Sequence, residues 1–321
     1  MGAPEMIHLP PKGLIIPLVT PLNERGEIDW ASLKRLIEGT LPFGDALFVA
    51  EGMIGEGLSL PNRKRLELLT RAWEIVAGRK PLFLSPTAET PEETLRNMIT
   101  LEKTFSRGPG KETIFWVDLP LWYHSNRKLP NLYLEWTRQT PFPFLLYNHP
   151  SLIAQLGRSL KRRNIRTAVM KRLCENEQIV GLIQVGDLKR TIHYQRAVRS
   201  RRDFRFYDGD EMNFLDSPSS SGVVSSGANL FPKEWSEIVS ASLTPSEDPG
   251  QNLSVLKESQ KLRELRQVLQ PPSVKNLKIA LAYLGIISHS RVLDREDSSI
   301  LEEDLKIKRF LEKIFSLQVH R

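Results

Sequence analysis

The sequence predicts an α/β protein, a (β/α)₈ TIM barrel with a C-terminal helical appendage. Eight short apolar, β-branched or aromatic runs alternate with longer helical patterns along the chain. These runs are continuously hydrophobic, as parallel strands covered on both faces are. A doubly wound sheet would normally carry a glycine-rich phosphate turn after an early strand, and the chain has no such turn. The three features together favour a closed barrel.

The predicted strands follow one another at the spacing that an interposed helix requires. Helical periodicity between them is clearest at Trp30–Glu38, Asn62–Val76, Pro91–Phe105 and Arg163–Glu175. The strands are expected at Leu14–Val19, Ala46–Ala50, Pro81–Ser85, Thr113–Asp118, Pro143–Tyr147, Ile179–Val185, Phe204–Tyr207 and Gly222–Ser226.

The pattern changes after the eighth run. Leu243–Gly250 is rich in Pro, Ser and Asp, which is typical of a connection. Charged and apolar residues then recur at helical spacing over Leu253–Leu269, Val274–Leu284 and Ser299–Phe315. We therefore expect a barrel over residues 1–242 and a helical appendage over 243–321, packed on the barrel.

The composition limits the cellular setting and the partners. The net charge is +7, with basic clusters over residues 158–172 and 199–205. No aromatic residue lies within the first cluster and only Phe204 lies within the second, so they favour solvated helix faces over nucleic-acid binding. The chain shows neither an apolar run of about 20 residues nor the charged start and apolar core of a signal peptide. Cys174 is the only cysteine, which excludes intramolecular disulfides. We expect a cytoplasmic protein without a membrane partner.

Several segments at the expected strand ends form an ordered set of motifs. Their order and spacing resemble the dihydrodipicolinate synthase/N-acetylneuraminate lyase family from about Gly13 to Gly285. The matching segments are 18–21 (LVTP), 26–29 (GEID), 51–56 (EGMIGE), 78–81 (GRKP), 147–151 (YNHPS), 179–181 (IVG), 209–211 (GDE), 222–229 (GVVSSGAN) and 274–285 (VKNLKIALAYLG).

The resemblance implies a pyruvate site in which a lysine of the sixth strand forms an imine with the substrate. It implies no cofactor. Aligning Ile179–Leu182 with the motif of that strand puts Ile183 at the lysine position. Isoleucine cannot act as a nucleophile. Gln184 follows where the family usually has Glu, and Lys189 falls beyond the strand end.

Other matched positions also differ from the family pattern. Met53 and Ile54 replace two threonines that resemble a carboxylate grip and part of a proton relay. Leu152 replaces an arginine that contacts the second substrate's acid group, and Trp122 stands in the place of a tyrosine. The pocket should therefore be more apolar than a pyruvate site. Its predicted lining is Gly52, Met53, Ile54, Trp122, Leu152 and Val224.

Tyr147 is the one catalytic position of the family that survives. In the family this tyrosine transfers protons beside the imine, and the alternative here is a buried tyrosine kept for packing. Asp118 and His149 also lie at strand ends and could hold a divalent metal with other polar residues. Their spacing carries no metal-binding signature, so no metal is predicted.

Three functions remain open. The first is a pseudoenzyme or binding module, because the nucleophile, the threonine relay and the arginine are lost together. The second is an altered enzyme that acts on a small carbonyl or keto-acid substrate through Tyr147 with His149, Asp118 or a metal. The third is a standard pyruvate-dependent lyase with a relocated lysine. The first is favoured, and the resemblance implies a homo-oligomer (dimer or tetramer) with a small carboxylate or keto-acid ligand.

Overall fold

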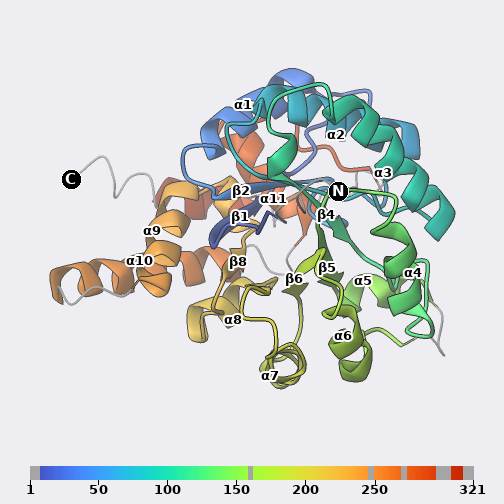
Figure 1. Cartoon of the computed structure of the whole chain (residues 1–321). Helices are drawn as coiled ribbons and strands as arrows, with labels where there is room; N and C mark the ends of the chain where they lie inside the picture. Colours follow the sequence, from blue (N-terminus) through green and yellow to red (C-terminus); the bar gives the residue numbers. More distant parts are fainter. Residues whose placement is uncertain (1–7, 158–161, 245–248, 269–272, 294–304, 314–321) are drawn as a thin grey trace.

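The computed structural model describes residues 8–157, 162–244, 249–268, 273–293 and 305–313. Eight parallel strands form a closed barrel in chain order, and β8 pairs with β1 to close it. Helices surround the barrel (Figure 1). The prediction of a (β/α)₈ barrel followed by C-terminal helices is confirmed.

The strands match the eight predicted runs to within two residues at either end. They are β1 (Gly13–Pro17), β2 (Ala46–Val49), β3 (Leu82–Leu84), β4 (Ile114–Asp118), β5 (Phe144–Asn148), β6 (Ile179–Gln184), β7 (Arg205–Asp208) and β8 (Gly222–Val224). The eighth strand ends earlier than predicted because a short 3₁₀ turn, η2 (Gly227–Asn229), follows it.

Side chains cap the first turns of several helices of the barrel. Asp29, Thr90 and Asp187 each accept a hydrogen bond from a backbone N–H three residues ahead. The barrel helices are α1 (Trp30–Thr40), α2 (Asn62–Val76), α3 (Pro91–Phe105), α4 (Leu129–Trp136), α5 (Pro150–Gln155), α6 (Thr167–Leu173), α7 (Leu188–Ala197), α8 (Glu211–Asp216) and α9 (Pro232–Leu243).

Helix α6 is shorter than the predicted Arg163–Glu175. The backbone N–H groups of Ile165 and Arg166 donate to the side chains of Asn148 and Asn126, at 2.9 and 2.7 Å. These bonds hold the chain in a non-helical path, so the helix begins only at Thr167. Such long-range partners are invisible to a local sequence pattern.

The barrel interior is a packed core rather than a channel. Aromatic rings from facing strands fill it, and Phe83 makes edge-to-face contacts with Phe115 and Tyr207 at ring-centroid distances of 5.6 and 5.8 Å. All three rings are almost completely buried. The packed interior therefore leaves open space within the barrel only at its ends.

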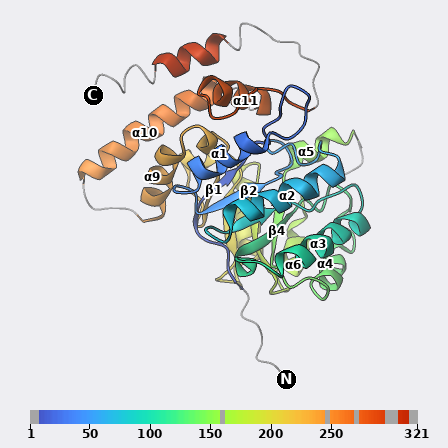
Figure 2. The same ribbon diagram turned by 90° about the horizontal axis from the view of Figure 1, so that it is seen from above.

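The C-terminal helices cover one side of the barrel (Figure 2). Helix α10 (Pro249–Val268) packs on α9, and α11 (Val274–Tyr283) follows it. The predicted helix over Ser299–Phe315 is helical at residues 305–313, and its remaining residues lie outside the described ones. The expected division between residues 242 and 243 stays a prediction.

One buried ion pair joins α11 to the barrel. Lys278 is completely buried, and its ammonium group contacts the Glu56 carboxylate and donates to the Arg291 carbonyl. The second Glu56 oxygen accepts from the Leu293 N–H at 2.8 Å. Burial lowers the pKa of Lys278, while the Glu56 carboxylate acts to raise it. The pair fixes the appendage to the loop that follows β2.

Candidate functional site

The loop between β2 and α2 folds tightly back on its own start. Ala50 has a φ of 56°, a left-handed conformation that a residue with a Cβ rarely adopts. Two glycines make the close approach possible, because a Cβ on Gly55 would lie 2.5 Å from the Glu51 nitrogen and one on Gly57 would lie 1.9 Å from the Ala50 oxygen. Thr20, from the end of the first strand, donates to the Gly55 carbonyl at 2.6 Å. The loop is thus held in one shape over the end of the barrel.

Glu51 directs its carboxylate into this loop. Its Oε2 lies 2.9, 2.5 and 3.4 Å from the backbone nitrogens of Met53, Ile54 and Gly55. Successive N–H groups that converge on one point form an anion-binding nest. Glu51 is 2% exposed, so this nest is filled by the protein itself.

Tyr147 holds the other Glu51 oxygen. Its hydroxyl donates to Glu51 Oε1 at 2.9 Å. Burial raises the pKa of Tyr147 well above its usual value, and the Glu51 carboxylate raises it further. A phenol in this state keeps its proton, so the hydroxyl acts here as a hydrogen-bond donor.

His149 lies beside Tyr147, at a ring-centroid distance of 5.4 Å. Its Nδ1 accepts from the Leu152 N–H at 3.2 Å and caps α5. Burial lowers the pKa of His149, which favours the neutral ring with its proton on Nε2. The sequence prediction that Tyr147 and His149 share one end of the barrel agrees with this geometry.

Ile183 lies next to Tyr147 on the neighbouring strand. The Cα atoms of the two residues are register partners between β5 and β6, so their side chains point to the same side of the sheet. Ile183 is completely buried. A nucleophile at position 183 would have stood beside the Tyr147 ring, and a branched hydrocarbon stands there instead.

A small cavity of about 50 Å³ opens over these residues at the carboxyl end of the barrel. Its only cationic side chain among the described lining residues is Arg266, which comes from α10 in the appendage. No lysine belongs to this described lining. The lining is Pro17, Glu51, Met53, Ile54, Tyr147, His149, Gly209, Glu211, Val224, Ser226 and Arg266.

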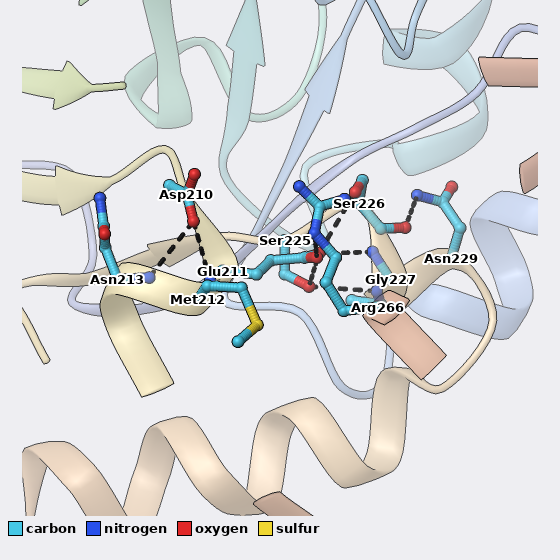
Figure 3. Close-up of polar contacts among 10 residues, drawn as sticks. Asp210, Glu211, Met212, Asn213, Ser225, Ser226, Gly227, Asn229 and Arg266 are labelled. Atoms are coloured by element: carbon cyan, nitrogen blue, oxygen red, sulfur yellow. Dashed lines mark hydrogen bonds and ion pairs between the residues drawn. The ribbon is translucent and has the colours of Figure 1, made fainter. Parts of the chain in front are cut away.

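Arg266 reaches the cavity through an ion pair with Glu211. Figure 3 shows Glu211 at the centre of a cluster with Ser225, Ser226, Gly227 and Arg266 around it. Glu211 Oε1 accepts from the two serine hydroxyls at 2.8 and 3.2 Å and from the Gly227 N–H at 2.7 Å. Its Oε2 lies 3.6 Å from the Arg266 Nε. The cluster ties the appendage to the rim of the cavity.

Asp118 belongs to a different buried cluster. It is completely buried and accepts from the hydroxyls of Thr87, Tyr123 and Tyr133 at 2.8, 2.5 and 2.5 Å. Burial raises its pKa, although these hydrogen bonds act to lower it. With its acceptors engaged and its place outside the cavity lining, Asp118 is not brought together with His149. Within the described ranges no three His, Cys, Asp or Glu side chains are arranged to hold a metal ion.

Five of the six predicted lining residues are divided between two cavities. Met53, Ile54 and Val224 line the 50 Å³ cavity. Gly52, Met53 and Leu152 line a neighbouring cavity of about 280 Å³, which the first residues of α11 complete. Among the described residues that line these two cavities, Trp122 does not occur.

Sequence reasoning missed two features of the site. It treated Glu51 only as one of the strand-end polar residues that could hold a metal, although a carboxylate directly before a glycine-containing loop is a signal for capture by backbone N–H groups. It also missed Arg266, which lies 55 residues beyond Glu211 in a helix with no motif of its own.

Within the described ranges no helix is long and apolar enough to cross a membrane.

Comparisons with known proteins agree with the fold. The sequence profile of the Dihydrodipicolinate synthetase family matches residues 10–312. The 4-hydroxy-tetrahydrodipicolinate synthase of Shewanella pealeana is 26% identical over 92% of this chain and 98% of its own length. The same enzyme of Buchnera aphidicola is 29% identical over 72% of this chain and 75% of its own.

Solved structures show the same architecture. Dihydrodipicolinate synthase from Bacteroides thetaiotaomicron superimposes with a TM-score of 0.78 at 25% identity, over 96% of this chain and all of the other. YagE, a prophage protein of Escherichia coli K12 solved in complex with pyruvate, gives a TM-score of 0.78 at 19% identity, over 94% and 98% of the two chains. At 19% identity the second likeness concerns the fold alone.

Proposed function

This chain belongs to the dihydrodipicolinate synthetase family, and from that premise we propose that it has lost Schiff-base aldolase and lyase activity and acts as a pseudoenzyme or binding module. The observation that carries the proposal is Ile183, a buried hydrocarbon side chain beside Tyr147. Formation of an imine requires a neutral amine at the reacting carbonyl. Isoleucine offers none, and loss of a nucleophile costs on the order of 10⁶-fold in kcat in a serine protease.

The surroundings of Ile183 support the same conclusion. Glu51 occupies the N–H groups of the β2 loop, and the Tyr147 hydroxyl donates a hydrogen bond to Glu51. Met53 and Ile54 offer no side-chain hydroxyl to move a proton from Tyr147 into the cavity. The N–H groups that could bind a substrate carboxylate are therefore already occupied. The described residues that line the cavity include no lysine to attack the substrate carbonyl.

A relocated lysine is the main alternative within the family chemistry. Lys189 is exposed on α7. Two further lysines belong to α11. Lys278 is buried and forms an ion pair with Glu56 of the β2 loop, and Lys275 lines the 280 Å³ cavity. Neither α11 lysine lines the cavity beside Tyr147.

Borohydride trapping with pyruvate tests the proposal directly. The wild-type protein should show no added mass after reduction, by intact mass and peptide mapping. A matched control is the Ile183→Lys/Glu51→Ala double variant, which restores an amine and empties the loop. A stable adduct on Lys275, Lys278 or any other lysine of the wild type would overturn the proposal and locate the imine.

A second candidate, an altered enzyme, is favoured by one observation. Tyr147 and His149 line the same cavity, and the neutral His149 ring presents a proton on Nε2. Such a pair could polarise a small carbonyl substrate. Proton–deuterium exchange at the carbon next to the carbonyl of small ketones and keto acids, followed by NMR, tests this candidate. Exchange that His149→Gln abolishes would favour it over the pseudoenzyme.

The proposal includes the setting and the partners. A homo-oligomer in the cytoplasm is expected, with the C-terminal helices available for contacts between subunits. The basic character of the chain (net charge +7) suits a small acidic ligand or partner. Light scattering after gel filtration tests the oligomer, and a monomer at micromolar concentration would exclude it.

A further inference from the structure

The positive charge of the chain is concentrated in one segment. Residues 162–202 contain eleven Lys or Arg and three Asp or Glu, a net charge of +8 in a chain whose total is +7. Nine of these eleven cationic side chains are exposed to solvent. Of the eleven, Arg201 alone forms an ion pair with a residue that the structure describes, Asp203. Most of this charge is therefore available to a partner.

Helices α6 and α7 present these cations on one continuous surface. The two helices pack side by side (Figure 1). The Tyr194 hydroxyl of α7 donates to the Ile165 carbonyl, just before α6, at 2.5 Å. Arg201, beyond the end of α7, donates to the Cys174 carbonyl at the end of α6, at 3.0 Å. The exposed side chains of residues 162–173 and 188–202 are called the α6–α7 face below.

Two large apolar side chains are exposed on this face. Leu188 is 53% exposed and Ile192 is 38% exposed. They lie four residues apart in α7, so they are neighbours on the same side of the helix. Lys189 and Arg196, both exposed, flank them. Single exposed apolar residues are common on protein surfaces, whereas an adjacent pair bordered by charge is typical of a surface that a partner covers.

We propose that the α6–α7 face binds an acidic amphipathic helix of a partner protein. The carboxylates of that helix pair with the exposed cations, and its apolar side covers Leu188 and Ile192. No residue of this face belongs to the described lining of the two cavities at the end of the barrel. The inference therefore goes beyond the proposed function and does not depend on the loss of the lysine.

The charge of the face argues against a second copy of this chain as the occupant. A twofold contact would place the same basic surface on both sides of the interface, and like charges in an interface repel one another.

The apolar pair and the buried aromatic rings argue against nucleic acid. A phosphate backbone could pair with the cations but would leave Leu188 and Ile192 uncovered. The aromatic rings of this segment, Tyr194 and the adjacent Phe204, are buried and offer no platform on which bases could stack.

The first experiment compares two synthetic peptides of equal composition. Each contains about 16 residues of Glu and Leu and carries a fluorescent label. One has its leucines three and four residues apart, on one side of a helix, and the other has them distributed around the helix. Fluorescence anisotropy should show that the wild-type protein binds the first peptide at least about tenfold more tightly, because only this peptide can cover the apolar pair.

The double variant Leu188→Ser/Ile192→Ser tests the apolar contribution. It should weaken binding of the amphipathic peptide by at least about tenfold and abolish the preference for it over the second peptide. Circular dichroism should show an unchanged fold, because both side chains are exposed.

The double variant Lys189→Glu/Arg196→Glu tests the charge contribution. It should weaken binding by at least about tenfold and reduce the dependence of the affinity on salt. The matched control is Lys306→Glu/Lys308→Glu, which makes the same change of charge at two exposed positions of the helical segment 305–313. The control should retain the wild-type affinity within about twofold.

Four results would overturn the proposal. The first is no binding of the amphipathic peptide or no preference for it, and the second is an equal loss of affinity in the control variant. The third is binding of a single-stranded DNA of about 20 nucleotides that Lys189→Glu/Arg196→Glu weakens, without binding of the peptide, which would assign the face to nucleic acid. The fourth is a smaller mass of Leu188→Ser/Ile192→Ser than of the wild type in light scattering, which would assign the face to a second copy of the chain.

Discussion

Two glutamates five residues apart in one loop have opposite roles. Glu51 lies at the start of the β2 loop and is bound by the N–H groups of the next few residues and by Tyr147. Glu56 lies at its end and is bound by Lys278 and Leu293, which are 222 and 237 residues away in the sequence. Both are almost completely buried.

The difference lies in what each carboxylate neutralises. Glu56 neutralises the positive charge of the buried Lys278, so loss of the Glu56 carboxylate would leave the Lys278 ammonium without a counter-charge in the interior. Glu51 forms no ion pair within the described part of the chain, so we expect that a group that satisfies the same donors can replace it. Glu56 thus joins the appendage to the barrel, whereas Glu51 fills the N–H groups of its own loop.

Glu56→Gln should destabilise the protein by about 3–5 kcal/mol, because it leaves the Lys278 ammonium buried without a counter-charge. Urea unfolding followed by circular dichroism measures the effect. The control is the Glu56→Leu/Lys278→Met double variant, which removes both charges and should recover most of the loss. If Glu56→Gln costs no more than Glu51→Gln, the contrast between the two ends of the loop is wrong.

Asp208 is a buried carboxylate that forms no ion pair with any residue that the structure describes. Burial raises its pKa to about 6 from the usual 3.8, although the hydrogen bond from the Ser219 N–H acts to lower it. A raised folded-state pKa stabilises the fold fully below pH 3.8, and this stabilisation is lost as the pH rises through about 6. The loss amounts to about 3 kcal/mol.

Asp208→Asn should therefore stabilise the protein more at about pH 7 than at about pH 4. Asparagine can still accept from the Ser219 N–H, so the packing is preserved. Urea midpoints of both proteins at the two pH values give the answer. An equal shift at both values would show that Asp208 does not carry this pH dependence.

Tyr147→Phe should cost about 1.5–3 kcal/mol, because it removes the one hydrogen bond to Glu51 that comes from outside the loop. Tyr133→Phe is the matched control, since Tyr133 shares its acceptor Asp118 with Tyr123 and Thr87. Thermal unfolding should show the larger loss for Tyr147→Phe. A larger loss of stability for Tyr133→Phe would show that the hydrogen bonds to Asp118 contribute more than the hydrogen bond from Tyr147 to Glu51.

Glu51→Gln should change the stability by less than about 1 kcal/mol, because the amide oxygen still accepts from the nest and no cation loses its partner. Urea unfolding checks this against the wild type. A loss of several kcal/mol would give Glu51 the structural weight that we assign to Glu56.

Much of the architecture was predictable from local signals. The continuous apolar runs located all eight strands, and α2 and α3 have the bounds that the sequence predicted. Ile183 could be assigned from the order of the motifs alone, because a strand register preserves sequence order. These features depend on neighbours along the chain, which a sequence displays directly.

The tertiary structure alone decided how the site is occupied. The N–H groups that hold Glu51 point to one place only because Ala50 turns the chain and because Gly55 and Gly57 permit a close approach. The partners that complete the site, Tyr147 and Arg266, lie 96 and 215 residues beyond Glu51. The sequence by itself determined the barrel and predicted that Ile183 stands at the lysine position. Whether the remaining donors face a ligand or the chain's own carboxylate depends on backbone direction and long-range contact, which no local pattern encodes.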